Sequence, residues 1–120
     1  MFKAIFGGKS GAALKHMSVA ALKQQHGPSA PFTLIDVRSP GEYAQDGHIA
    51  GARLMPLDAL AQRMAELPKD QPVAVICRSG GRSRVACDLL LRAGFADVTN
   101  VDGGMGAWVG AGFPVRRGEQ

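Results

Sequence analysis

The sequence has little of several residue types, and each shortage excludes a class of protein. Only two cysteines occur among 120 residues, which is too few for a disulfide framework, and they form no Cys-x-x-Cys pair or Cys/His cluster. The three histidines are scattered along the chain. No apolar run approaches the roughly 20 residues of a membrane-spanning helix. We therefore expect no metal site and no membrane partner.

Charge of either sign is also sparse. The net charge is +4, from 14 basic and 10 acidic residues, and no long run of lysine or arginine occurs. A basic excess this small does not indicate a nucleic-acid partner. The apolar start of the chain is interrupted at Gly7, Gly8, Lys9 and Ser10, unlike the continuous apolar segment of a signal peptide. We expect a cytoplasmic protein whose thiols stay reduced.

The length and patterning predict one domain. Residues 1–13 show only weak periodicity, and we expect a loose tail there, followed by a single domain over residues 14–120. Short apolar runs alternate with helical patterns throughout that domain. This alternation predicts an α/β fold, with a mainly parallel central sheet of about five strands and helices on both faces. Strands are expected over residues 14–17, 32–37, 73–76 and 97–101. Helices are expected over residues 19–25, 57–67 and 105–109. A short helix is also expected to begin at residues 39–40, and another to follow the strand at 73–76 and end at residue 94.

The most informative segment follows the apolar run at residues 73–76 and opens a helical pattern. It reads Cys77-Arg78-Ser79-Gly80-Gly81-Arg82-Ser83 and is called the Cys77 loop below. Free N–H groups and the dipole at a helix start favour an anion over such a loop. The two glycines let the backbone approach a ligand closely, and the two arginines add positive charge. These surroundings favour the nucleophilic thiolate, whereas a cysteine that only packs in a core needs none of them. The other cysteine, Cys87, lies near the buried face of the helix, and we expect it to pack inertly.

Three segments together resemble the rhodanese-like domain family of sulfurtransferases. They are residues 36–43 with 47–52 and Pro56, the Cys77 loop, and residues 101–108. The resemblance runs from roughly residue 15 to 115. One small departure is Asp46, which we expect to lengthen the turn between Tyr43 and Gly47.

The resemblance implies a three-layer rhodanese-like fold and a sulfur-transfer chemistry. Cys77 would take the outer sulfur of a small anionic donor such as thiosulfate, forming a covalent persulfide. Cyanide or an acceptor thiol would then remove that sulfur, and a sulfur-relay protein could serve as partner. No metal or organic cofactor is needed. The substrate would be bound by Arg78, Ser79, Gly80, Gly81, Arg82 and Ser83, through their amides and the two guanidinium groups.

Four further residues are expected to support the site rather than react. Asp36 would accept hydrogen bonds from a neighbouring loop. Arg38 and Glu42 would form an ion pair that braces the same edge, or else remain a solvated surface pair. His48 would hydrogen-bond a loop, because exchange at an ionised thiol needs no strong base. A tight turn is expected at residues 103–104.

Two alternative functions remain open at this point. A phosphatase or arsenate reductase of the same fold family has five residues between cysteine and arginine. Here four residues separate Cys77 from Arg82, and Ile76 stands where such phosphatases usually carry histidine. The smaller loop suits a single sulfur atom better than a phosphate. A non-catalytic interaction module is disfavoured because the cysteine and its glycine loop are intact. The sequence does not distinguish among sulfur donors and acceptors.

Overall fold

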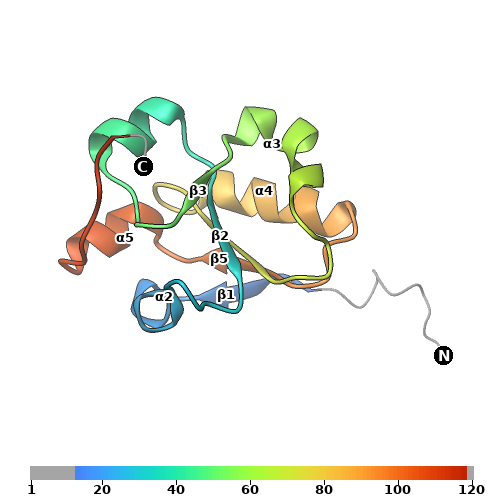
Figure 1. Ribbon diagram of the computed structural model, residues 1–120, viewed down its shortest axis with the longest axis horizontal. Helices are drawn as coiled ribbons and strands as arrows, with labels where there is room; N and C mark the ends of the chain where they lie inside the picture. Colours follow the sequence, from blue (N-terminus) through green and yellow to red (C-terminus); the bar gives the residue numbers. More distant parts are fainter. Residues whose placement is uncertain (1–12, 119–120) are drawn as a thin grey trace.

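The computed structural model describes residues 13–118, which form a five-stranded parallel sheet covered by helices on both faces (Figure 1). The α/β class with a parallel sheet is therefore confirmed. The tail expected over residues 1–13 lies almost wholly outside the described residues. The strands are β1 (Lys15–Met17), β2 (Thr33–Asp36), β3 (Arg53–Leu54), β4 (Val73–Ile76) and β5 (Val98–Val101), in the spatial order β1-β5-β4-β2-β3. The helical segments are α2 (Val19–Gln25), η1 (Glu42–Asp46), α3 (Leu57–Arg63), η2 (Met64–Glu66), α4 (Gly81–Arg92) and α5 (Gly104–Gly110).

Strand β4 lies at the centre of the sheet and separates two hydrophobic cores. Val73 and Val75 point into a core shared with α3 and α4, whereas Ala74 and Ile76 point into a core shared with α2 and α5. Figure 1 shows these two helix pairs on opposite sides of the sheet. A strand buried on both faces needs a continuous apolar run, which explains why residues 73–76 show no polar alternation.

Three local features differ from the sequence prediction. Strand β3 was not predicted, because two residues carry no periodicity that a pattern can detect. The helix expected over residues 57–67 ends at Arg63 and continues as the 3₁₀ turn η2. The short helix expected from residues 39–40 onward is η1, a π-helical turn that begins at Glu42 and contains Asp46. A π-helical turn holds more residues than an α-helical turn and so accommodates Asp46 before Gly47.

The parallel arrangement brings the functional loops to one edge of the sheet. The segments that follow β2, β4 and β5 all leave the carboxyl ends of their strands, where ligands bind in open α/β sheets. These segments contain Arg38, the Cys77 loop and Gly103 respectively. Within residues 13–118, no helix combines the length and apolarity needed to cross a membrane.

Candidate active site

The Cys77 loop folds around the sulfur of its first residue. The Gly80 N–H donates a hydrogen bond to Cys77 Sγ with an N···S distance of 3.0 Å, and the Ser83 hydroxyl lies 3.4 Å from the same sulfur. Gly80 has a φ of +124°, which side chains larger than hydrogen rarely tolerate. The tight return of the backbone toward its own cysteine therefore depends on glycine at this position.

Two opposing effects set the pKa of Cys77. Burial raises it, because the thiolate loses hydration. Hydrogen bonds from the Ser83 hydroxyl and from the amides of Ser83, Gly80 and Ser79 lower it, and their sum outweighs burial. The pKa of Cys77 therefore lies below its ordinary value. By contrast, burial raises the pKa of Cys87 to about 12. Cys87 lies fully buried in the core between the sheet and α4, so Cys77 is the thiol that ionises more readily.

The first turn of α5 orients the backbone of the loop. The Met105 N–H donates to the Cys77 carbonyl at 2.8 Å, and the Gly106 N–H donates to the Arg78 carbonyl at 2.9 Å. First-turn amides have no acceptor within their own helix, so they are available for these bonds. Because N–H and C=O point in opposite directions across a planar peptide, the Ser79 N–H turns away from α5 and toward the sulfur.

Gly104 allows this close approach. A Cβ at position 104 would lie 2.4 Å from the Cys77 carbonyl oxygen and 2.6 Å from that of Arg78, and Gly104 also has a positive φ of +58°. The turn predicted at residues 103–104 therefore also brings the first-turn amides of α5 against the Cys77 loop.

The outer side of the loop is open. Cys77 is only 1% exposed, but Arg78, Ser79 and Gly81 around it are exposed. A Cβ placed on Gly80 or Gly81 would meet no atom within 4 Å. The space directly beside Gly80 and Gly81 on the outer side of the loop is therefore clear of protein atoms.

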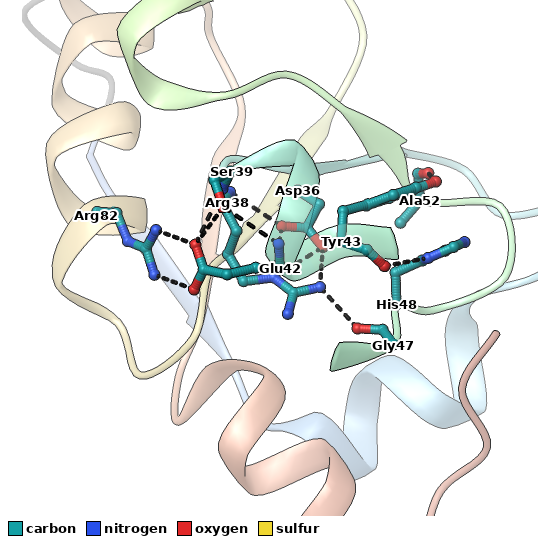
Figure 2. Close-up of polar contacts among 9 residues, drawn as sticks. All are labelled: Asp36, Arg38, Ser39, Glu42, Tyr43, Gly47, His48, Ala52 and Arg82. Atoms are coloured by element: carbon teal, nitrogen blue, oxygen red, sulfur yellow. Dashed lines mark hydrogen bonds and ion pairs between the residues drawn. The ribbon is translucent and has the colours of Figure 1, made fainter. Parts of the chain in front are cut away.

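Arg82 pairs with Glu42 rather than standing free. Its two terminal nitrogens donate to the two carboxylate oxygens at 2.6 and 2.9 Å (Figure 2). Glu42 also accepts from the Ser39 N–H, while the Ser39 hydroxyl accepts from the Glu42 N–H, which forms a reciprocal cap. This bidentate pair ties the start of α4 to η1. The guanidinium that we expected to bind substrate is thus already engaged within the protein.

The expected ion pair between Arg38 and Glu42 is wrong. Arg38 is buried and turns back onto Asp36, with a shortest N···O distance of 2.8 Å, and donates a further bond to the Gly47 carbonyl at 2.9 Å. Arg38 follows Asp36 by two residues, so both its main-chain N–H and its side chain reach that carboxylate. Removing one partner of such a buried pair leaves an uncompensated charge, at a typical cost of about 3–5 kcal/mol.

His48 lies under η1 and packs against it. Its ring stacks on Tyr43 with centroids 3.6 Å apart, and its Nδ1 lies 2.8 Å from the Tyr43 carbonyl oxygen (Figure 2). Its main chain exchanges two hydrogen bonds of 2.8 Å with Arg116. These contacts place His48 in the support of η1, together with the Asp36–Arg38 pair.

Sequence reasoning missed one polar residue of the site. Asn100 lies in β5 and is buried, with its amide between Ser83 and Asp102. The signal was present in the sequence, because asparagine is depleted in strands and here lies within the strand pattern Val98-Thr99-Asn100-Val101.

The family model for the rhodanese-like domain matches residues 18–111. The chain belongs to the rhodanese-like domain family. A sulfurtransferase from Allochromatium vinosum is 40% identical over 95 residues, which cover 79% of this chain and 88% of the relative. The thiosulfate sulfurtransferase GlpE from Pseudoalteromonas translucida is 35% identical over 99 residues, which cover 82% of this chain and 92% of the relative. Similarity to these enzymes supports sulfur transfer as the general class of activity.

Solved structures of rhodanese-like proteins have the same fold. A rhodanese-related protein from Thermoplasma volcanium matches with a TM-score of 0.76 and 31% identity, over 85% of this chain and 97% of the other. The rhodanese-like domain of an Anabaena protein matches with a TM-score of 0.77 and 32% identity, over 87% and 80% of the two chains. The three-layer rhodanese-like fold expected from the sequence is therefore confirmed.

This rhodanese-like domain also has a cavity that is separate from the Cys77 loop. It measures about 770 Å³ and lies between the end of α2, the start of β2 and the segment 114–116. Trp108 lines this cavity and donates its indole N–H to the Pro114 carbonyl at 2.8 Å. None of the residues that line the cavity belongs to the Cys77 loop.

Replacement of Glu42 by glutamine is expected to reduce the acid sensitivity of folding. The hydrogen bond from Arg82 lowers the pKa of Glu42 from 4.5 to about 2. A group whose folded pKa is depressed stabilises the fold above its ordinary pKa and loses that contribution as the pH falls toward the folded pKa. Urea unfolding should therefore show wild type more stable than Glu42→Gln by about 1 kcal/mol at pH 7. The difference should disappear between pH 4.5 and about 2.

A surface pair provides the control for this measurement. Glu66 pairs with Arg63 at 3.1 Å and also with Arg53, and all three side chains are more than one third exposed. Glu66→Gln should therefore change stability less than Glu42→Gln, because solvent screens an exposed pair. A stability difference for Glu42→Gln that stayed constant with pH would mean that the Glu42 charge is not its source.

Proposed function

We propose that this protein is a rhodanese-type sulfurtransferase that carries sulfane sulfur on Cys77. The main support is the convergence of three amides and one hydroxyl on the Cys77 sulfur, which lowers its pKa despite burial. Its family membership and its similarity to sulfurtransferases point the same way. The loop amides that stabilise an anionic sulfur on Cys77 also stabilise the anionic persulfide that such an enzyme must hold.

The first step of the proposed reaction is a displacement at thiosulfate. The Cys77 thiolate attacks the outer sulfur, a new S–S bond forms, and the S–S bond of thiosulfate breaks. The electron pair of that bond leaves with sulfite. The negative charge of the thiolate ends on the outer sulfur of the persulfide, so charge and atoms balance without a metal, an organic cofactor or an external reductant.

The second step returns the protein to its starting state. A cyanide ion or an acceptor thiolate attacks the outer sulfur, and the electron pair of the persulfide bond returns to Cys77 Sγ. The product is thiocyanate or a new persulfide. Because the protein alternates between two covalent states, ping-pong kinetics are expected. A persulfide on a sulfur-relay protein could replace thiosulfate as donor by the same displacement.

The two arginines of the loop have different roles in this proposal. Arg82 is held by Glu42 and positions the start of α4. The Arg78 side chain is exposed and, within residues 13–118, makes no hydrogen bond or ion pair. Arg78 is therefore the residue that we expect to bind the sulfonate end of thiosulfate and to stabilise departing sulfite.

Incubation with thiosulfate is expected to add the mass of one sulfur atom to Cys77. Intact-protein mass spectrometry should detect the adduct in wild type and in Cys87→Ser, but not in Cys77→Ser, and cyanide should remove it. Absence of the adduct from a folded wild-type protein would contradict thiosulfate as donor. Release of phosphate from a phosphomonoester would favour the phosphatase alternative. A folded protein inert in both assays would favour an interaction module.

Arg78→Ala is expected to raise the KM for thiosulfate by about tenfold, the effect of losing one charge-assisted hydrogen bond. The KM for an uncharged sulfur donor should stay within about twofold, because such a donor makes no ionic contact. Arg92 is a matched control, since it is an exposed arginine of α4 paired with Asp88. Arg92→Ala should leave both constants unchanged. Equal effects of Arg78→Ala on the two donors would mean that Arg78 does not bind the sulfonate.

A further inference from the structure

A chain of hydrogen bonds connects the Cys77 sulfur to β5 through Ser83. The Ser83 hydroxyl hydrogen-bonds to Asn100 Oδ1, and Asn100 Nδ2 donates to Asp102 Oδ1 at 2.8 Å. Asn100 is only 2% exposed. The orientation of the Asn100 amide decides whether its oxygen or its NH₂ group faces Ser83. It therefore affects the hydrogen bond that Ser83 can make to the Cys77 sulfur.

The Asp102 carboxylate fixes the orientation of the Asn100 amide. Hydrogen bonds from His16 and Asn100 hold the pKa of Asp102 below its ordinary value, so the carboxylate is ionised near neutral pH. An ionised carboxylate only accepts hydrogen bonds, so the NH₂ group of Asn100 must face Asp102. The oxygen of the amide therefore faces Ser83 and can only accept.

Ser83 has a single hydroxyl proton and three acceptors around it. These are Asn100 Oδ1, the Gly80 carbonyl at 3.1 Å and Cys77 Sγ at 3.4 Å. A protonated Cys77 can donate its own S–H to Ser83 while Ser83 donates to Asn100. A thiolate has no proton to give, so it is stabilised only when Ser83 turns its proton toward the sulfur.

We propose that Asn100 is a positioning residue that competes with the Cys77 thiolate for the Ser83 proton. The proposal rests on the proposed function of Cys77 as the sulfur carrier. In the free thiolate, Ser83 donates to the sulfur and Asn100 Oδ1 loses its donor. In the persulfide, the charge lies on the outer sulfur, and Ser83 can return its proton to Asn100. The competition thereby favours the sulfur-loaded protein over the free thiolate.

Replacement of Asn100 by leucine, which has a similar shape and no acceptor, tests this competition. The rate of Cys77 alkylation by iodoacetamide would be followed against pH in a Cys87→Ala background, where Cys77 is the single thiol. The midpoint should fall by about 0.5–1 pH unit in Asn100→Leu, because the thiolate keeps the Ser83 hydrogen bond. It should rise by a similar amount in Ser83→Ala. In Ser83→Ala/Asn100→Leu it should equal that of Ser83→Ala alone.

The ionisable residues around the loop are the same in every variant of this comparison. They are Arg78 in the loop, Arg82 and Arg84 on α4, Glu42 on η1, Asp36 on β2, and Asp102 after β5 with its partner His16 on β1. The Asn100 variants remove one hydrogen bond to Asp102, whose other bond, from His16, remains. Thr99→Val is the matched control. Thr99 precedes Asn100 in the same strand, so its side chain points to the opposite face of the sheet. The midpoint of Cys77 alkylation in Thr99→Val should match that of the Cys87→Ala background protein. Asn100→Val, with a residue suited to strands, serves if Asn100→Leu does not fold.

Two results would overturn the proposal. A midpoint that rises or stays the same in the Asn100 variants would mean that Asn100 does not draw the Ser83 proton away from the sulfur. A fall of equal size in the Ser83→Ala background would mean that Asn100 acts by another route. The alkylation profile does not involve sulfur transfer. The expected profile together with no thiosulfate adduct would therefore count against the proposed function and not against the role of Asn100.

Discussion

The site depends on two hydrogen bonds that the first turn of α5 donates to the carbonyls of Cys77 and Arg78. With these carbonyls held against α5, amides of the loop are left to face the sulfur. The close contact between α5 and the loop requires a residue without Cβ at position 104. The positive φ with which the loop turns back toward the Cys77 sulfur requires glycine at position 80. Two separate sequence motifs, the Cys77 loop and residues 101–108, thus together place partial positive charge around a thiolate.

The opposite side of the loop is held by a second set of contacts. The Glu42–Arg82 pair ties η1 to the start of α4, while the buried Asp36–Arg38 pair and the stacked Tyr43 and His48 rings hold η1 on the sheet. Apart from Arg82, these residues belong to the first motif of the family resemblance, and their contacts are structural. They fix the direction in which α4 leaves the loop, and with it the position of Ser83 beside the sulfur.

Much of the fold follows from local patterns. The run at residues 73–76 predicts a strand, which is β4, and the helical pattern over 19–25 predicts α2. At the start of α2 the Ser18 hydroxyl accepts a hydrogen bond from the Ala21 N–H. The loop after β4 was likewise located from its glycines and arginines. Side-chain pairing could not be predicted in the same way. Arg38 pairs with Asp36, and Glu42 pairs with Arg82. Which partner each side chain meets depends on burial and on distances between elements that exist only in the folded chain. Strand β3 and the contact of Asn100 with Ser83 depend on the same long-range packing.

Hydrogen bonds to the Cys77 sulfur outweigh the cost of burying it. Titration of the thiolate ultraviolet absorbance in wild type and in Cys77→Ser tests this directly. The account predicts a step with a midpoint below 9.0, the ordinary value for a cysteine, which disappears in Cys77→Ser. The step of Cys87 should appear only near pH 12. A Cys77 midpoint at or above 9.0 would contradict the account, because burial would then dominate at the sulfur.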